Sequence, residues 1–332
     1  MRPRYWLLST ISIILIASAA IAGLNAAIDI YGLYRPTRGL CLGVYGDPRV
    51  AKYLLSMRHV PENFNAILTG ASISANWDVK RIEKLRVYNG SITGGTIVEE
   101  KAVIDAALER PGISVAFLLV HPALTWSHEF RTVEMTPGLK RSALGSLSLW
   151  DAYKDMARIR LGLRPATFDC SGTETFLSMP SAMNINMRQM WNAPEFTVDP
   201  IALRAWRTLI AGLRRRRVQL IFIVPPTSES LLRTKGVPLQ IFMERMRSAI
   251  GPSDLWIDFL RPEYKEYRES RNFSDGVHLF PASANRVVEQ INAQVDQWIA
   301  DGRLDLLEPR KLASIPVHAA AELEKRDLSD RK

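Results

Sequence analysis

Short apolar runs alternate with amphipathic segments along most of the chain. Five runs bounded by polar residues, glycine or proline are typical of buried parallel strands, and they cover Asn65–Gly70, Arg86–Gly90, Ser114–Val120, Gln219–Pro226 and Leu255–Phe259. Helical patterns lie between and after these runs, over Ile97–Arg110, Pro200–Arg217, Pro238–Ile250 and Pro281–Ala300. This alternation predicts an α/β fold in which helices cover both faces of a five-stranded, mostly parallel sheet.

Two segments depart from the alternation. The interval 122–199 has little strand character and contains the methionine-rich string SMPSAMNINMRQM. Because it is longer than an ordinary connection between a strand and a helix, we expect it to form a helical insertion or lid. The last segment, 304–332, is charged and alanine-rich and is predicted to be a weakly ordered tail.

The N-terminus carries a candidate membrane segment. The chain begins MRPR and continues with an uncharged apolar stretch, Tyr5–Leu24, and about 20 such residues span a bilayer as a helix. Arg2 and Arg4 favour a cytoplasmic start. Residues 1–28 are therefore predicted to be a cytoplasmic tip and a transmembrane anchor. A cleaved signal peptide is the alternative, since small residues suited to a peptidase follow. Either form directs the main domain outside the cytoplasm.

Residues 29–61 are interpreted as a connector between this anchor and the main domain, 62–303, and they include a helical pattern around RVAKYLLSMRHV. The chain has two cysteines, Cys41 and Cys170, and an extracytoplasmic compartment permits a disulfide between them. Sequence alone does not show whether their Cα atoms approach closely enough. The expectation is two buried free thiols, with the disulfide as the alternative.

Composition and charge narrow the classes of function. The chain has 332 residues, 47% of them hydrophobic, and a formal net charge of +9, which allows one sizeable core and a solvated basic face. It lacks the aromatic interleaving and zinc spacings of nucleic-acid-binding proteins, so no nucleic-acid partner is expected. His59, His128 and His318 show no metal-ligand spacing, and NGSITGGT does not match a dinucleotide fingerprint. We predict no metal and no cofactor.

Candidate catalytic residues follow the predicted strands. Ser72 comes directly after the first strand in ILTGASIS, and Asp275 and His278 follow the fifth strand in NFSDGVHLFP. The carboxyl ends of parallel strands meet at one edge of a sheet. A serine nucleophile needs a base, and the base needs a partner that orients it, so these residues form a candidate triad. A helix-capping role for Ser72 is the alternative.

With these residues the chain resembles the SGNH-hydrolase superfamily, also called the GDSL esterase-like superfamily, over about 65–299 with the insertion unmatched. It is similar in particular to membrane-anchored bacterial members linked to surface polysaccharides, such as the alginate acetylation proteins and the D-alanine transfer protein of teichoic acids. The resemblance implies a flavodoxin-like three-layer α/β/α domain. It assigns the nucleophile to Ser72, the base to His278 and the orienting acid to Asp275.

The resemblance also assigns residues that bind the oxyanion, with two departures from the family pattern. It places an N–H donor at Gly94 or Gly95, with Gly90 as a further alternative. The usual Gly-Asp-Ser is Gly-Ala-Ser here, and the asparagine expected after the third strand is missing from LLVHPALTW. His121 can occupy that space and donate a hydrogen bond, or it can be a structural histidine. Losing one oxyanion donor costs about 10²–10³ in rate.

The resemblance implies a serine esterase or O-acyltransferase, tethered to the inner membrane by a single pass with its main domain in the periplasm. Its implied substrate is an acylated cell-surface or exported polysaccharide, or a small acyl ester. Whether water or a sugar hydroxyl receives the acyl group depends on how the insertion excludes water. The alternative is a catalytically degenerate accessory protein that binds glycan or a polysaccharide-assembly partner.

Overall fold

The computed structural model describes residues 3–125, 135, 138–140, 143, 149–176, 179, 185–251 and 254–305. The helices are α1 (Pro3–Ile28), α2 (Pro48–Ser56), α3 (His59–Asn63), α4 (Ser72–Ala75), α5 (Ile97–Ala107), α7 (Trp150–Arg160), α8 (Ile185–Asn192), α9 (Pro200–Arg215), α10 (Glu229–Arg247) and α11 (Pro281–Ala300). The strands are β1 (Ala66–Thr69), β2 (Val87–Asn89), β3 (Val115–Leu119), β4 (Gln219–Val224) and β5 (Leu255–Asp258). Short 3-10 helices are η1 (Val79–Arg81), η2 (Pro122–Leu124), η4 (Pro262–Arg268) and η5 (Ser270–Asn272). Apart from its first two residues, the predicted tail 304–332 lies outside the described residues.

The strands form one parallel sheet in the order β2-β1-β3-β4-β5. This is the flavodoxin-like order, in which the chain reverses direction across the sheet after β2. In the middle of the sheet, Leu68 pairs with Phe117, and Phe117 pairs with Ile221. All residues of β1, β2 and β3 are buried, because helices cover both faces, and this explains their nearly continuous apolar runs. The predicted fold class is confirmed.

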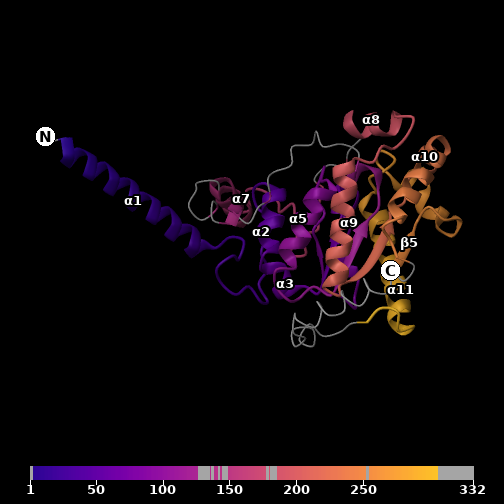
Figure 1. Ribbon diagram of the computed structural model, residues 1–332, viewed down its shortest axis with the longest axis horizontal. Helices are drawn as coiled ribbons and strands as arrows, with labels where there is room; N and C mark the ends of the chain where they lie inside the picture. The colour runs from indigo at the N-terminus through magenta and orange to yellow at the C-terminus, as the bar shows by residue number, and fades with distance from the viewer. Residues whose placement is uncertain are drawn as a thin grey trace, which may run out of the picture.

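Helices pack on both faces of the sheet. On one face α2 packs against α5, and α5 packs against α9. On the other, α11 packs against η1, and Figure 1 shows α11 behind the sheet in yellow. Right-handed crossovers between parallel strands produce this division into layers. The helical pattern noted in the predicted connector becomes α2, and Leu54 and Leu55 bury their side chains completely in the domain core.

One helix begins earlier than the sequence pattern indicates. We expected a helix over Pro238–Ile250, but α10 begins at Glu229 and carries Pro238 inside it. A proline in a helix interior removes one backbone hydrogen bond and costs about 3 kcal/mol. Leu239 and Phe242, both buried, pack the following turns into the core and hold the helix together. Tertiary packing therefore outweighs the helix-starting preference of proline here.

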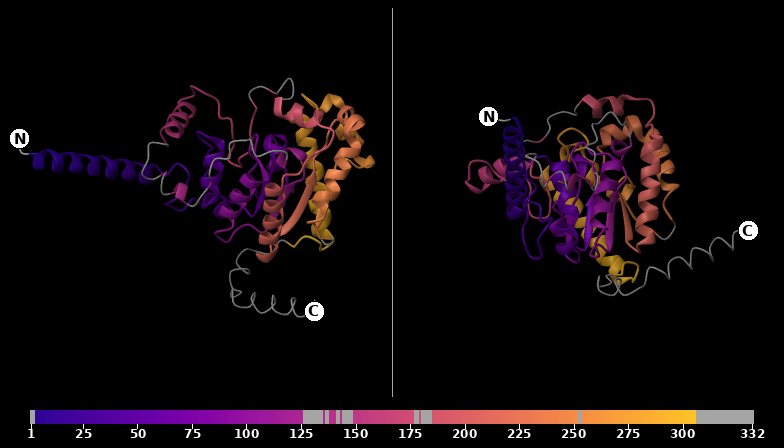
Figure 2. Two further views of the ribbon diagram at one scale, coloured as in Figure 1. Left: turned by 45° about the horizontal axis from the view of Figure 1, so that its top comes forward. Right: turned by 60° about the vertical axis from the view of Figure 1, so that its left-hand side comes forward.

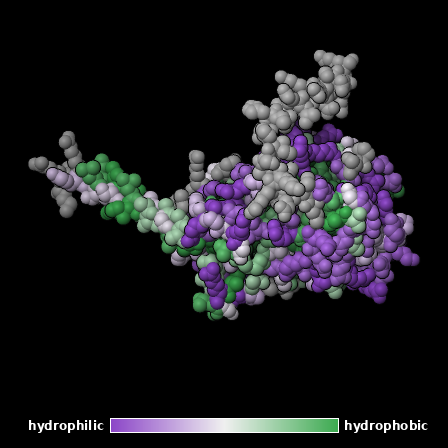
Figure 3. All heavy atoms as spheres, turned by 90° about the horizontal axis from the view of Figure 1, so that it is seen from below, coloured by the Kyte–Doolittle hydropathy of each residue, from purple (hydrophilic) through white to green (hydrophobic). Residues whose placement is uncertain are grey.

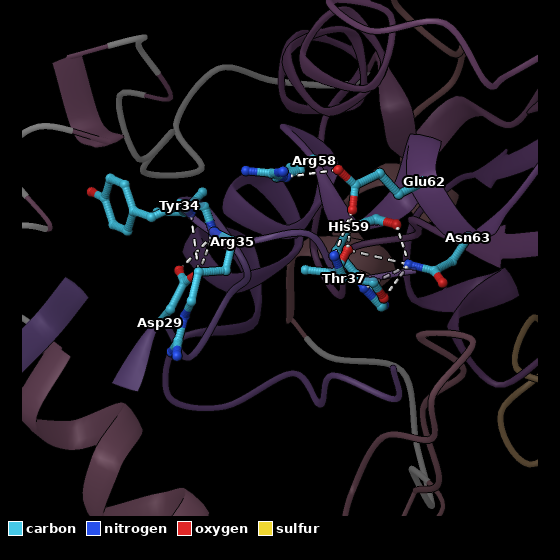
Figure 4. A network of polar contacts seen from close by, with 9 residues as sticks. Asp29, Tyr34, Arg35, Thr37, Arg58, His59, Glu62 and Asn63 are labelled. Atoms are coloured by element: carbon cyan, nitrogen blue, oxygen red, sulfur yellow. Dashed lines mark hydrogen bonds and ion pairs between the residues drawn. The ribbon is translucent and has the colours of Figure 1, made fainter. Parts of the chain in front are cut away.

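Polar contacts fasten the connector to the domain (Figure 4). The carboxylate of Asp29 accepts the backbone N–H groups of Leu33, Tyr34 and Arg35 at 2.6, 3.1 and 2.9 Å. Further along, the carboxylate of Glu62 accepts the N–H of Thr37 at 2.6 Å. The segment between α1 and α2 is thus held at its start by a buried carboxylate and near its middle by a half-buried one.

The cysteines form a disulfide between Cys41 and Cys170, and the expectation of two buried free thiols is wrong. Their Cα atoms lie 5.1 Å apart although 129 positions separate them in sequence. The loop that carries Cys170 folds back on the domain, because the N–H of Asn89 donates to the carbonyl of Ser171 at 2.7 Å. Both cysteines are exposed. Long-range pairing of this kind depends on tertiary contacts that no local pattern records.

The N-terminal apolar helix is present as predicted. The membrane-compatible part of α1 runs from Tyr5 to Ile28, 24 residues with a mean hydropathy of 2.3, and no residue of its apolar 18-residue window is buried. Figure 3 shows α1 as a largely apolar rod that projects from a mostly hydrophilic body. A membrane anchor and a signal sequence both have this form.

Candidate active site

Ser72 stands at the carboxyl edge of the sheet. β1 ends at Thr69, and Ser72 is the first residue of α4. The turn between them requires Gly70, since a Cβ atom there would lie 2.2 Å from the Oγ of Ser74. The residue that caps α4 is Ala71, so Ser72 does not serve as the helix cap. Its side chain is partly exposed and can meet a substrate.

A chain of hydrogen bonds links the three candidate residues. The Oγ of Ser72 lies 2.8 Å from the Nε2 of His278, and the Nδ1 of His278 lies 2.7 Å from Oδ2 of Asp275. An ionised carboxylate only accepts hydrogen bonds, so Nδ1 carries the ring proton of the neutral imidazole. Nε2 therefore accepts the hydroxyl proton of Ser72. This is the arrangement that a serine needs in order to be activated as a nucleophile.

The loop that carries His278 is held in place from several sides. Phe273 and Leu279 pair as an isolated antiparallel bridge that closes a tight hairpin. Gly276 at its tip has φ +98°, a left-handed conformation that suits glycine, and its carbonyl accepts the N–H of Ser228 at 3.0 Å. The side-chain amide of Asn76, just after α4, donates to the carbonyl of Leu279 at 3.0 Å. These contacts fix the imidazole relative to the helix that begins with Ser72.

Asp275 is ionised in this setting. Burial of its carboxylate raises the pKa. The hydrogen bond from His278, the positive charge that His278 carries when protonated, and two backbone N–H groups outweigh burial and lower the pKa below its usual value. Those N–H groups belong to Val277 and His278 and lie 3.1 and 2.8 Å from Oδ1. The side chain of Asp275 is fully buried. A buried carboxylate with these donors holds the imidazole in one orientation.

The structure distinguishes among the glycines after β2. The loop lies beside the nucleophile turn, because the N–H of Ile92 donates to the carbonyl of Gly70 at 2.9 Å. The N–H of Gly95 is engaged with the carbonyl of Ile92 at 2.7 Å, and that of Gly90 with Leu68 at 2.7 Å. Within the described part of the chain, the N–H of Gly94 has no acceptor. Gly94 is therefore the glycine in this loop whose N–H remains available to a ligand.

His121 is a neutral histidine at the end of β3. Burial lowers its pKa to about 3, and the positive charge that the nearby His278 carries when protonated contributes further. Its Nδ1 accepts the N–H of Ala123 at 3.1 Å, so the proton of the neutral ring is on Nε2. Among the described residues this buried Nε2 atom has no hydrogen-bond partner. A buried donor without an acceptor is rare in folded proteins.

Sequence reasoning did not identify Asn89 and Lys52, which support this site. The side-chain amide of Asn89 donates to the carbonyls of Ser74, Ala75 and Trp77 at 2.9, 3.2 and 3.2 Å. It thereby provides hydrogen-bond donors for the backbone carbonyls at the carboxyl end of α4, whose first residue is Ser72. A polar residue that ends a buried strand is a signal that could have indicated this role.

Lys52 of α2 is fully buried next to the loop that follows β2. Its Nζ donates to the carbonyls of Asn89, Ser91 and Gly172 at 2.9, 2.6 and 2.9 Å. Burial lowers the pKa of Lys52 to about 7, although Glu174 and Asp169 act in the opposite direction. In the sequence, Lys52 stands between the apolar residues VA and YLL, a pattern that indicates a buried lysine. Its partners, which lie up to 120 positions away in sequence, are not predicted by that pattern.

Within the described residues, no group of three or more histidine, cysteine, aspartate or glutamate side chains is placed to hold a metal ion. No protein-family model and no curated sequence matches the chain. Among solved structures, the chain is similar to one described as a platelet activating factor from Streptococcus pneumonia, with 10% sequence identity and a TM-score of 0.40. The match covers 75% of this chain and 90% of that chain.

Proposed function

We propose that this chain is a serine-dependent carboxylic-ester hydrolase or O-acyltransferase of the SGNH type. The hydrogen-bonded series from Ser72 through His278 to Asp275 carries the proposal. The residues come from two strand ends, because Ser72 follows β1 while Asp275 and His278 share the hairpin after β5, and 206 positions separate Ser72 from His278. A capping serine or a structural histidine would not require this alignment.

The proposed reaction follows from the protonation states. The Oγ of Ser72 attacks the carbonyl carbon of an ester while its proton passes to Nε2 of His278. When the tetrahedral intermediate collapses, the carbon–oxygen bond to the alcohol breaks, and the alcohol leaves with the proton from Nε2. The acyl group remains on Ser72 until water or a sugar hydroxyl, deprotonated by His278, attacks it. The bond between the acyl carbon and Oγ then breaks, and Oγ of Ser72 regains its proton from Nε2 of His278. The carboxylate of Asp275 stabilises the imidazolium in both halves of the reaction.

The negative oxygen of the intermediate needs donors, and we assign three. The backbone N–H of Ser72 opens α4, the N–H of Gly94 has no acceptor among the described residues, and the buried Nε2–H of His121 is equally unpartnered there. A buried donor without a partner costs about 1–3 kcal/mol. An oxyanion that forms only during the reaction would accept hydrogen bonds from these donors. The free energy recovered in this way lowers the barrier of the reaction.

The substrate class and location come from the resemblance to membrane-anchored SGNH proteins. We infer an acylated surface or exported glycan as substrate, with α1 as a single-pass inner-membrane anchor and the main domain in the periplasm. The apolar length of α1 and the disulfide between Cys41 and Cys170 support that compartment. Assembly proteins for the same polysaccharide are the expected protein partners.

A fluorophosphonate probe tests the proposed function directly. We expect the full chain, in detergent or nanodiscs, to be labelled covalently, because only an activated serine reacts with this probe at a useful rate. Mass spectrometry of the peptides should place the label on Ser72. Lack of labelling in folded protein, under conditions in which an unrelated serine esterase reacts, would support the accessory-protein alternative.

The role of His121 can be tested by substitution. His121→Ala is expected to lower kcat/KM for a short acyl ester about 10²-fold through loss of an oxyanion donor. His121→Asn should recover part of the rate, since its side-chain amide can donate to the same oxygen. Thermal unfolding of both variants serves as the control. Equal rates in all three proteins would leave His121 with a structural role only.

A further inference from the structure

A segment of the insertion exposes apolar and cationic side chains together. It runs from Trp150 to Arg164, covering α7 and the turn after it, and we name it the α7 segment. Trp150, Leu161 and Leu163 are 58%, 72% and 73% exposed. Large apolar side chains grouped beside cations are typical of surfaces that lie at a membrane interface.

The turn after α7 presents its leucines outward. The N–H of Gly162 donates to Ile159 and that of Leu163 donates to Arg158, at 3.0 and 2.8 Å, and Gly162 has φ +70°. This is a Schellman end, in which the residue after the glycine usually packs against an apolar side chain of its own helix. Here the facing position is Arg158, so Leu163 finds no such partner. The geometry of the turn therefore leaves Leu163 exposed.

The α7 segment lies beside the domain end of α1, as Figures 1 and 2 show. The hydroxyl of Tyr153 donates to the side chain of Asn25 at 2.7 Å, and Asn25 also donates to the carbonyl of Ala143 at 3.1 Å. Met156 and Arg160 line a cavity of about 310 Å³ together with Ile28, the last residue of α1, and residues that follow it. The base of α1 and the α7 segment thus form one packed unit.

The length of α1 sets the depth of this unit in a bilayer. An α-helix rises about 1.5 Å per residue, so about 20 residues cross a hydrocarbon layer of about 30 Å. The apolar stretch begins at Tyr5, which places Leu24 at the far boundary and the polar Asn25 among the lipid headgroups. Since Tyr153 contacts Asn25 directly, the α7 segment lies at the same level.

The charged side chains of the α7 segment favour contact with an anionic lipid surface. Lys154 pairs with Asp151 at 2.6 Å, and Arg164 pairs with Asp155. Within the described residues, no carboxylate pairs with Arg158 or Arg160, and both are exposed. Each exposed cation near an anionic leaflet contributes about 1 kcal/mol of attraction.

We propose that the α7 segment docks on anionic phospholipids of the bilayer that α1 spans. Trp150, Leu161 and Leu163 enter the interface, and Arg158 and Arg160 contact lipid phosphates. This inference rests on the proposed role of α1 as a membrane anchor. It gives the domain a second attachment, which fixes its orientation to the membrane surface.

Site-directed spin labelling of the full chain in nanodiscs tests the docking. The two native cysteines are joined in the disulfide, so one introduced cysteine is the only thiol that reacts. Leu163→Cys is the test position and Ile14→Cys, in α1, is the lipid-embedded control. Val237→Cys is the aqueous control, because Val237 is also apolar and 70% exposed but lies on α10. Collision with oxygen reports lipid, and collision with a water-soluble nickel chelate reports water.

We expect the Leu163 label to collide with oxygen more, and with the chelate several-fold less, than the Val237 label in discs that contain phosphatidylglycerol. Replacing Arg158 and Arg160 by glutamine should move the Leu163 label towards the aqueous values. If the Ile14 label is embedded while Leu163 and Val237 behave alike, the docking is wrong and the anchor stands. If the Ile14 label is also in water, the anchor and the docking both fail.

Discussion

Replacing Ser72 or His278 by alanine is expected to abolish fluorophosphonate labelling and to lower ester hydrolysis at least about 10³-fold. Ser72→Ala removes the only hydroxyl that lies within hydrogen-bond distance of Nε2 of His278 among the described residues, at 2.8 Å. His278→Ala leaves that hydroxyl without a base. Rates of hydrolysis of a short acyl ester, measured beside the labelling, provide the comparison.

Controls separate loss of chemistry from loss of fold. Ser270→Ala changes an exposed serine of η5 and should leave both labelling and hydrolysis as in the unchanged protein. Asp275→Ala should reduce the rate less than the other two changes, because an orienting acid contributes less than the nucleophile or the base. Full labelling of folded Ser72→Ala protein would contradict the assignment of the nucleophile.

Lys52→Met is expected to lower the free energy of unfolding by about 3 kcal/mol at pH 8, as the buried carbonyls around Nζ lose their hydrogen-bond donor. Those carbonyls belong to Asn89, Ser91 and Gly172. Methionine has nearly the same length, so the cavity is small. We also expect slower ester hydrolysis, since the loop that carries Gly94 loses its support. Chemical denaturation and kcat/KM measurements check the two effects.

The pH dependence of stability tests the lowered pKa of the buried Lys52 amine. Burial lowers its pKa from 10.5 to about 7 in the folded chain. Between these values the unfolded chain binds a proton that the folded chain does not, so the free energy of unfolding rises with pH. Lys52→Met should reduce this slope between about pH 7 and pH 10. Lys84→Met, at an exposed position, should keep it. Equal slopes in the two variants would contradict the lowered pKa.

Much of the fold could be predicted from local patterns. The strands are short, apolar and bounded by breakers, and helices cover both of their faces, so their sequences reveal burial without reference to neighbours. The rule that the carboxyl ends of parallel strands converge also predicts that Ser72, Asp275 and His278 lie close together. Two of these residues are near in sequence, and the third immediately follows a strand.

Features that depend on contacts between residues far apart in sequence could not be predicted from local patterns. The pairing of Cys41 with Cys170 requires a loop to fold back across the domain, and sequence separation says nothing about that approach. The beginning of α10 at Glu229 depends on packing that holds the helix through Pro238.

The amino-acid sequence by itself determined the parallel sheet, the apolar N-terminal helix and the candidate triad, because periodicity and strand ends are local properties of a chain. Only the tertiary structure decided that Gly94 has an unengaged N–H while Gly95 does not. It alone placed Lys52 against carbonyls from two distant loops. Hydrogen-bond partners and burial depend on which segments meet in space, and those meetings result from the packing of the whole domain.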